Sequence, residues 1–563
     1  MKLNIVSNGN EKHAELMLRK ISERIPVEIT DGGLAVSLRI DPSIGRAESY
    51  EISEKDGVYI INGSDSLGLY YGIGKFLHTA IWTDGDLVPA PPKGVKSPDC
   101  DLRIMYFSIH NYNWYQTAPT EELEAYVEDM LLWGYNAIHC IVPVMNITAI
   151  GDEVFEETVA RARRVFLITK KLGMKTSLGI NPNQGVLGSP HEFDAEQDKF
   201  SRWGGGAGRN LCPSKPGALE HLKEIWRAKF ERFTDIGIDY VHTWPYDEGG
   251  CCCDECWPWG AKKYGDTSLA VFEEAKKYFP NVKTVVSTWT FDWHEEGGSG
   301  EYEGLYKRLK GDMSGIDYLM TDAHGDYPKY VLTHDVIKPI VNFPEISMWG
   351  LYPWGGFGAN PLPKRFQRIW DSSKRVLSGG MPYSEGIYED ILKIQFAGYY
   401  WDKDRNYKDI LSEYINYEYR CGDPDKIIEM MELIEENHAD VEEFRPFDTE
   451  KARRALRLAE EVNERLTPKA KACWRWRILY IRAMLDVKRY EYFEAHGLTD
   501  KLGLYNLSRR SGYYLKDDET AQELMRELCG YFHTVDYNGQ NRWTHPPVDG
   551  GAPEDACSII FDD

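Results

Sequence analysis

Long apolar runs are missing from this chain. No stretch approaches the roughly 18–20 consecutive apolar residues that cross a membrane, and the first residues, Met1–Leu16, contain no apolar signal-peptide core. We therefore expect no membrane partner and a cytoplasmic location, unless a leader has been removed. Positive charge is also scarce, because 66 Lys and Arg face 89 Asp and Glu for a formal net charge of −23. Such a chain repels polyanions at long range, so no nucleic-acid partner is expected.

Cofactor and nucleophile motifs are absent as well. The sequence contains no GxGxxG or GxxxxGK[ST] loop, no HExxH helix and no GxSxG elbow, which argues against nucleotide, zinc-protease and serine-hydrolase chemistry. We expect no cofactor in catalysis. The 11 cysteines form an odd number, and four of them crowd between Cys251 and Cys256. That is not the spread of a secreted disulfide scaffold.

Aromatic side chains, by contrast, are plentiful, and the chain is long enough for several domains. It has 563 residues, with 17 Trp and 35 Tyr, whereas one domain typically takes about 100–200 residues. Aromatic faces suit stacking on sugar rings, although a large core would use them too. We expect a small α+β domain over residues 1–97, a catalytic barrel over 98–402 and a helical domain over 403–563.

The N-terminal part mixes the two kinds of secondary structure. Alternation at period two predicts a strand over Leu34–Ile40, and the apolar run Val58–Ile61 predicts a buried strand. A helix is expected at about His13–Arg24, and another after Gly63. The proline-rich segment Pro89–Pro98 has the composition of a linker.

A helix-then-strand rhythm repeats from Asp101 to about Trp401. Gly134, Gly173, Gly237 and Gly315 each follow an amphipathic stretch and precede an apolar one, as glycine does where a helix ends in the left-handed conformation. The eight strands that we expect are Ile104–Ile109, Ala137–Val142, Thr176–Ile180, Tyr240–Thr243, Thr284–Thr288, Tyr318–Thr321, Ser347–Gly350 and Gly380–Tyr383. Eight parallel strands with crossover helices predict a (β/α)8 TIM barrel, and a doubly wound open sheet is the alternative. The remainder predicts helices only, over Arg405–Cys421, Pro424–Phe444, Thr449–Leu466, Lys469–Ala495 and Glu519–Phe532.

Residues just after the barrel strands are the candidates for chemistry, because a barrel gathers its active site at the carboxyl ends of its strands. Carboxylates, amides, histidines and aromatic rings dominate there, as a sugar site needs. The candidate substrate-binding residues are His110, Asn111, Asn181, Trp244, Tyr246, Trp289, Asp292, His324, Trp349, Tyr352, Trp354, Tyr383 and Glu385. The catalytic candidates are Asp247 and Glu248, which follow the fourth strand between aromatic residues and two glycines. Burial among aromatic rings would raise the pKa of a carboxyl group and let it hold a proton near neutrality.

The segment from His242 to Glu248 resembles the His-x-Gly-Gly-Asp-Glu motif of family 20 glycoside hydrolases, the β-N-acetylhexosaminidases. The segment from Tyr50 to Leu77 is similar to the small domain that precedes the barrel in that family and in families 67 and 84. The segment Tyr383–Asp390 and the helical tail look more like the family 67 α-glucuronidases. The resemblance implies that Glu248 is the general acid/base and that Asp247 orients the 2-acetamido group whose oxygen is the nucleophile.

The chain departs from the family 20 pattern in two places. The spacing from His242 to Asp247 is one residue longer, and Pro245 and Tyr246 stand where the family has glycines. The family also has an Asp-x-x-Arg near the end of the first strand, whereas Phe107–Asn111 contains no Arg. These departures concern the identity of the bound sugar more than the class of reaction.

The cysteines that follow the acidic pair can serve in three ways. Cys251, Cys253 and Cys256 have a spacing that binds zinc, with Cys252 or Cys212 as a fourth ligand. Free buried thiols and one disulfide are the alternatives. A catalytic zinc is not expected, because four thiolates leave no open position on the metal.

These patterns predict an exo-acting glycoside hydrolase that is retaining and substrate-assisted, with a carbohydrate partner. One alternative is a glycosidase of another class, such as an α-glucuronidase or another hexosidase. It would use two separated carboxylates, Glu248 with Glu385 or with Asp292. A second alternative is a carbohydrate-binding barrel without catalysis. The sequence leaves the sugar, the anomer and the oligomeric state open.

Overall fold

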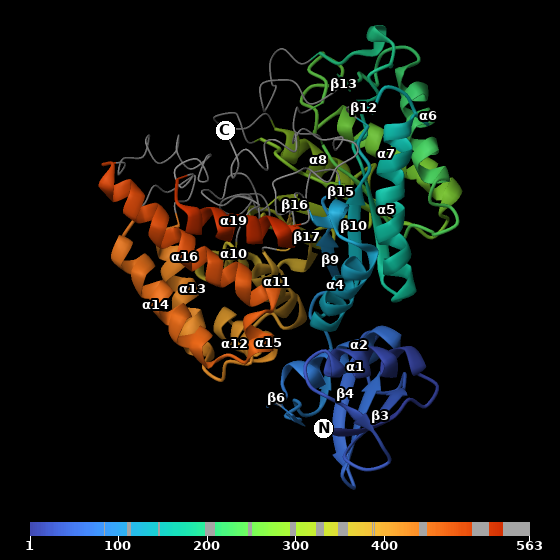
Figure 1. Cartoon of the computed structure of the whole chain (residues 1–563). Coiled ribbons are helices and arrows are strands. Elements are labelled where there is room, and N and C mark those ends of the chain that lie inside the picture. Colours follow the sequence, from blue (N-terminus) through green and yellow to red (C-terminus); the bar gives the residue numbers. More distant parts are fainter. Residues whose placement is uncertain are drawn as a thin grey trace.

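The computed structural model describes residues 1–83, 85–109, 114–144, 147–196, 209–245, 250–292, 300–322, 332–346, 359–384, 387, 389–438, 447–497 and 517–532. Three parts follow one another along the chain, as Figure 1 shows: an N-terminal sheet with helices, a barrel, and a layer of C-terminal helices against the side of the barrel. No helix among the described residues is long and apolar enough to cross a membrane.

The N-terminal part is a six-stranded sheet with two helices beside it. Its strand order is β2 (Glu28–Ile29), β1 (Lys2–Val6), β3 (Leu34–Ile40), β5 (Val58–Gly63), β4 (Tyr50–Lys55) and β8 (Val95–Lys96). Helix α1 spans Glu11–Ser22 and α2 spans Ser66–His78, and β6 (Ile81–Trp82) pairs with β7 (Leu87–Val88). The side chain of Asp65 caps α2 by accepting a hydrogen bond from the Gly68 N–H at 2.8 Å. Helix α2 lies against the barrel helix α4 (Thr120–Trp133).

The central part is a closed parallel barrel of eight strands. In chain order they are β9 (Leu102–Tyr106), β10 (Ala137–Ile141), β11 (Lys175–Ile180), β14 (Tyr240–Thr243), β15 (Lys283–Ser287), β16 (Tyr318–Asp322), β17 (Ile340–Phe343) and β18 (Leu377–Gly380). Pairing of β18 with β9, Gly379 beside Leu102, closes the ring. The barrel prediction is therefore confirmed, and closure excludes the open-sheet alternative.

One strand prediction was wrong. The seventh strand is Ile340–Phe343, whereas the expected Ser347–Gly350 lies outside the described residues. Pro339 and Pro344 flank this strand. Because proline is a turn and strand-end signal, the sequence pattern does not predict a strand over the four residues between them. The first and eighth strands also begin two and three residues earlier than expected, at Leu102 and Leu377.

Helices cover the outside of the barrel. They are α3 (Trp114–Thr117), α4, α5 (Glu153–Lys171), α6 (Ala218–Glu231), α7 (Lys263–Tyr278), α8 (Glu301–Lys310), α10 (Pro363–Ser373) and α11 (Asp390–Trp401). Gly134, Gly173 and Gly237 have positive φ after α4, α5 and α6, as expected, whereas Gly315 does not.

Two copies of the sequence Gly-Ile-Asp-Tyr close the amino-terminal end of the barrel in the same way. The Asp239 carboxylate accepts hydrogen bonds from the N–H (2.8 Å) and hydroxyl (3.2 Å) of Thr176 on β11. Asp317 accepts the same two bonds from Thr284 on β15, at 2.9 and 3.2 Å. These carboxylates lie at the end of the barrel opposite the candidate site, so their role is to join neighbouring strands.

The C-terminal helices are close to those predicted. They are α12 (Tyr407–Glu418), α13 (Pro424–Asn437), α14 (Thr449–Arg465), α15 (Pro468–Lys471), α16 (Trp474–Ala495) and α19 (Glu519–Phe532). A buried ion network joins them to the rest of the chain. Arg475 of α16 contacts Asp390 of α11 at 2.8 Å, Asp129 of α4 at 3.0 Å and Glu418 of α12 at 3.8 Å.

Candidate active site

Aromatic side chains form a layer across the barrel at the carboxyl ends of its strands. Alternation along each strand turns every second residue inward, which places Tyr106, Trp244, Trp289 and Phe343 in one interior cluster, with the partly buried Tyr383 packed against it. Ring centroids lie 4.7 Å apart for Trp244 and Phe343, 5.4 Å for Trp289 and Phe343, and 4.9 Å for Tyr106 and Tyr383. Trp244 and Trp289 are each only 6% exposed. The layer therefore fills the barrel and forms a floor beneath the loops that follow the strands.

Two histidines lie side by side among these rings. His139 of β10 and His242 of β14 have ring centroids 4.5 Å apart, and His139 Nδ1 is 2.8 Å from the Ser177 hydroxyl. Both ring nitrogens of His242 are buried without a hydrogen-bond partner in the described part of the chain. Burial lowers the pKa of His242 to about 3. This imidazole is therefore neutral near pH 7 and is not a general acid there.

Amide groups of the loop after β11 share this end of the barrel. Asn181, Asn183 and Gln184 are each no more than 3% exposed. The Asn181 and Asn183 Oδ1 atoms and the Gln184 Nε2 atom have no partner among the described residues. A buried polar group without a partner costs roughly 1–3 kcal/mol. A polar ligand such as a sugar, or ordered water, would offset that cost.

Glu345 is the described carboxylate that best suits chemistry at this end of the barrel. It follows β17, where Val341 and Phe343 belong to the barrel interior, so alternation directs Glu345 inward as well. A backbone bridge between Glu345 and Tyr383 continues the β17–β18 pairing three residues beyond the Asn342–Gly380 pair, and Glu345 is 7% exposed. A carboxylate at this position can act on a substrate as a nucleophile, a base or a hydroxyl ligand.

Asp292 has a local structural partner. Its carboxylate oxygens accept hydrogen bonds from the N–H groups of Glu301 (3.0 Å) and Tyr302 (3.1 Å), at the start of α8. The Glu301 carboxylate accepts a bond from the Asp292 N–H at 3.3 Å in return. Asp292 thus anchors the first turn of α8.

Many predicted site residues lie outside the described residues. These are His110, Asn111, Tyr246, Asp247, Glu248, His324, Trp349, Tyr352, Trp354 and Glu385. The described ones, Asn181, Trp244, Trp289, Asp292 and Tyr383, all lie at the carboxyl ends of barrel strands. Their roles toward a substrate stay predictions.

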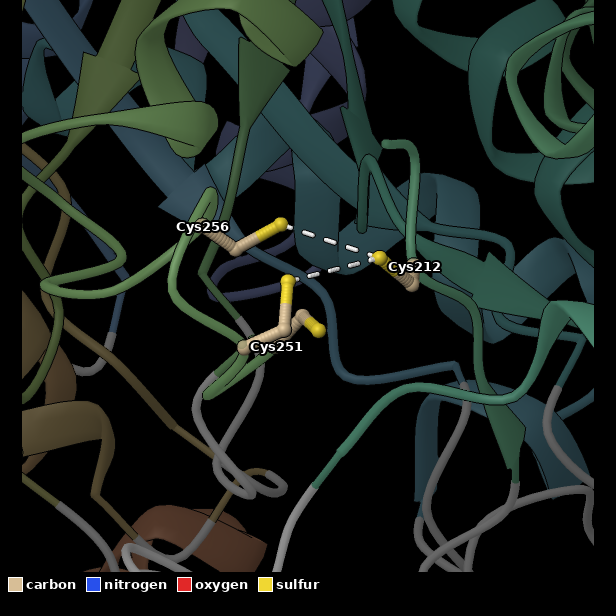
Figure 2. A group of neighbouring side chains, drawn as sticks. Cys212, Cys251 and Cys256 are labelled. Atoms are coloured by element: carbon tan, nitrogen blue, oxygen red, sulfur yellow. Dashed lines mark hydrogen bonds between the residues drawn. The ribbon is translucent and has the colours of Figure 1, made fainter. Parts of the chain in front are cut away.

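The four predicted cysteine ligands come together. The sulfur atoms of Cys212, Cys251, Cys253 and Cys256 all lie within 4.8 Å of one another. The Sγ of Cys212 is 3.8 Å from that of Cys253 and 3.8 Å from that of Cys256. Figure 2 shows the sulfurs of Cys251 and Cys256 pointing toward Cys212. The cluster could bind a structural metal such as zinc, and Cys252 is not part of it.

Sequence reasoning missed Glu345, Phe343, Tyr106 and His139. Phe343 and Glu345 were missed because the seventh strand was predicted at the wrong residues. The alternation of Val341, Phe343 and Glu345 is visible only once that strand is placed. Tyr106 belongs to the alternation of Leu102, Ile104 and Tyr106, which was available in the sequence. His139 sits within a buried strand, where no pattern distinguishes it from a core residue.

No family model matches the chain, and no curated protein matches it. Solved structures do resemble it. A family 89 glycoside hydrolase from Clostridium perfringens, in complex with 2-acetamido-1,2-dideoxynojirimycin, has a TM-score of 0.61 and 13% identity, over 94% of this chain and 70% of that one. A family 138 enzyme that targets pectin rhamnogalacturonan II has a TM-score of 0.57 and 11% identity, over 99% and 97%. A family 115 4-O-methyl-α-glucuronidase with specificity for decorated arabinogalactans has a TM-score of 0.57 and 12% identity, over 98% and 81%.

The chain has a glycoside hydrolase-like fold. A family 84 structure is also among the similar ones, with a TM-score of 0.51, so the likeness extends over several families. At identities of 11–14% these structures show the shared fold and no single family.

Proposed function

We propose that this chain is a glycoside hydrolase that removes a terminal sugar at the carboxyl end of its barrel. The observation that carries the proposal is the buried Glu345, which strand alternation directs inward, at the end of the barrel that holds the aromatic layer of Trp244, Trp289 and Tyr383. Rings of this kind offer apolar faces to sugar C–H groups, and a carboxylate beside them supplies half of what glycoside hydrolysis needs.

Glu248 is the proposed general acid/base. It lies five residues after the end of β14, and the intervening segment begins with the interior residue Trp244. Strand β14 and strand β17 are three positions apart in the eight-stranded ring. The carboxyl ends of these two strands therefore lie on different parts of the same barrel mouth, and we propose that Glu248 and the carboxylate that follows β17 flank the glycosidic bond.

Glu345 is the proposed second carboxylate, which makes the two-carboxylate mechanism the leading one. A retaining enzyme of this kind uses the second carboxylate as nucleophile, and an inverting enzyme uses it as a base toward water. A family 89 structure offers a parallel, because it holds its substrate GlcNAc-α-1,4-galactose in a variant with two glutamates replaced by glutamine. Glu345 thus replaces Glu385 and Asp292 as our preferred partner for Glu248.

Substrate assistance is the second candidate. It is favoured by the Asp247–Glu248 pair, in which Asp247 would orient a 2-acetamido group whose oxygen attacks the anomeric carbon. This mechanism needs a 2-acetamido sugar, whereas the two-carboxylate mechanism accepts a uronic acid or a plain hexose as well. A panel of aryl glycosides of N-acetylglucosamine, N-acetylgalactosamine, glucose, galactose and glucuronic acid, in both anomers, gives the substrate class.

The variants Glu248→Gln, Glu345→Gln and Asp247→Asn then separate the mechanisms. We expect Glu248→Gln to lose about 10²–10⁴-fold in turnover, as for loss of a general acid/base. If Glu345 is the nucleophile, Glu345→Gly is inactive on its own, and added azide restores release of the aryl group with formation of a glycosyl azide of inverted anomeric configuration. Glu274→Gln is the control, because Glu274 is also buried, at 3% exposure against 7% for Glu345, but lies on the outer helix α7.

Two other outcomes would each favour a different function or mechanism. Full activity of Glu345→Gln, together with loss in Asp247→Asn and tight inhibition by a thiazoline analogue of the cyclised intermediate, would establish substrate assistance instead. Binding of a sugar without turnover of any glycoside by the wild-type protein would contradict the enzyme proposal and favour the carbohydrate-binding alternative.

A further inference from the structure

We propose that Cys212, Cys251, Cys253 and Cys256 bind one Zn²⁺ ion, and that this ion fastens the loop after β14 to the loop after β11. The four ligands come from two separate connections of the barrel. Cys212 lies between β13 (Arg209–Asn210) and α6, and the other three lie between β14 and α7. The consequence for catalysis rests on the proposed role of Glu248, but the metal site itself does not.

The spacing of the sulfur atoms matches a tetrahedral zinc centre. Four sulfurs at about 2.3 Å from a central ion lie about 3.8 Å from one another. The Sγ of Cys212 lies 3.8 Å from that of Cys253 and 3.8 Å from that of Cys256, and all four sulfurs lie within 4.8 Å of one another. A disulfide would require about 2.05 Å, so neither of these pairs is one.

The backbone around the sulfurs is held in place by its own hydrogen bonds. The N–H of Lys215 donates to the Cys212 carbonyl at 3.1 Å, and the N–H of Cys256 donates to the Cys253 carbonyl at 2.9 Å, so each ligand-bearing segment turns tightly. Both segments also attach to the chain between β12 (Gln184–Gly185) and β13. There the Cys212 N–H donates to Phe193 and the Cys252 N–H to Glu196, each at 2.7 Å. Because these hydrogen bonds already hold both segments in place, metal binding requires little further loss of chain entropy.

Burial and ligand number assign the ion a structural role. Cys212, Cys251 and Cys256 are each no more than 1% exposed. Four thiolates complete a tetrahedron, which leaves no position for water or substrate. The neighbouring Cys252 is half-buried and outside the group, which gives the chain a matched control one residue away from two of the proposed ligands.

The proposed ion lies close in sequence to the proposed acid/base. Glu248 precedes Cys251 by three residues, and three residues of fully extended chain span at most about 11 Å. An ion bound to Cys251 therefore limits the volume within which Glu248 can move. Loss of zinc should lower the rate of the chemical step more than it weakens substrate binding.

Metal content of the full chain, purified under reducing conditions without added zinc, is the first test. We expect about one zinc per chain in the wild type and in Cys252→Ser, and less than one tenth in Cys212→Ser and Cys256→Ser. Reconstitution with Co²⁺ should produce the intense charge-transfer and ligand-field absorption of a tetrahedral thiolate site in the wild type and in Cys252→Ser only. A wild-type chain that holds neither zinc nor Co²⁺, or whose sulfurs prove to be disulfide-bonded by mass, would overturn the proposal even if the variants do not fold.

Activity is measured separately. If Cys256→Ser lowers kcat at least tenfold while KM stays within about twofold, and Cys252→Ser changes neither, the ion positions the loop as proposed. If zinc is bound but no glycoside is hydrolysed by the wild type, the proposed function fails and the metal site stands. If the metal-free variant keeps full turnover, the link from the metal to the acid/base loop is wrong.

Discussion

His242 is buried in the centre of the barrel, and its ionisation links stability to pH. Burial lowers its pKa from 6.5 to about 3, so the folded chain keeps this ring neutral while the unfolded chain protonates it below about pH 6.5. Between those two pH values the unfolded state binds more protons, and stability therefore falls as the pH is lowered. At pH 5 the contribution amounts to roughly 2 kcal/mol.

We expect the free energy of unfolding to drop between pH 7 and pH 5, and the drop to be smaller by roughly 2 kcal/mol in His242→Gln. Urea denaturation at the two pH values measures the difference, and the absolute loss caused by the substitution cancels from it. His191, whose side chain is 90% exposed, provides the control as His191→Gln. An unchanged pH dependence in His242→Gln would show that this ring is not held neutral.

At the scale of elements, the contact between α2 and α4 depends on the absence of a side chain. Gly74 lies in the middle of α2, and a Cβ added there would be 2.1 Å from the Leu132 carbonyl oxygen of α4. Alanine normally favours a helix over glycine by about 1 kcal/mol. Here the two helices would have to separate, which reverses the sign of the effect.

We expect Gly74→Ala to destabilise the protein by about 1–3 kcal/mol, the usual cost of overpacking. Thermal and urea unfolding measure the change. Gly32→Ala is the control, because no atom lies within 4 Å of the added carbon and its φ is not positive. Equal behaviour of the two variants would mean that α2 moves freely on α4.

Strand β17 is an element that the local sequence pattern did not predict. Its four residues lie between two prolines, and a short apolar run has no period that separates a strand from a buried turn. Only pairing with β16 and β18 defines the strand. Glu345 followed from that pairing, because its inward direction depends on the register of the strand that precedes it.

The whole molecule is joined by a buried network of charges. Besides its contacts with Arg475, Asp129 lies 2.6 Å from Lys20 of α1, and Glu418 lies 3.0 Å from Arg24 of the same N-terminal part. Burial alone would raise the pKa of Asp129, but the charges of Lys20 and Arg475 hold it well below its usual value. The network thus connects the N-terminal part, the barrel and the C-terminal helices.

We expect Arg475→Met to cost about 3–5 kcal/mol of stability, because three carboxylates lose their buried partner at once. The N-terminal part should also become easier to cleave in limited proteolysis, since its Lys20 and Arg24 contact two of these carboxylates, Asp129 and Glu418. Arg453→Met is the control: Arg453 pairs with Glu450 and Glu491 at the exposed surface, and such pairs contribute little. Stability of Arg475→Met equal to that of the control would contradict a joining role.

Local sequence pattern was sufficient for the barrel architecture with seven of its strands, for the helical C-terminal part and for three of the four cysteines that meet. Helix stops, apolar periodicity and cysteine spacing are short-range signals, and each predicts one element or one cluster at a time. The structure decided three things that depend on residues far apart in the chain: the place of the seventh strand, the inward carboxylate of Glu345, and the choice of Cys212 over Cys252 as fourth sulfur. Pairing of β11 with β14 brings the loop that holds Cys212 beside the Cys251–Cys256 segment, and a three-dimensional contact of that kind leaves no trace in local periodicity. The inward direction of the Glu345 side chain likewise depends on tertiary structure, because a shift of one residue in the register of a strand turns every side chain to the other face.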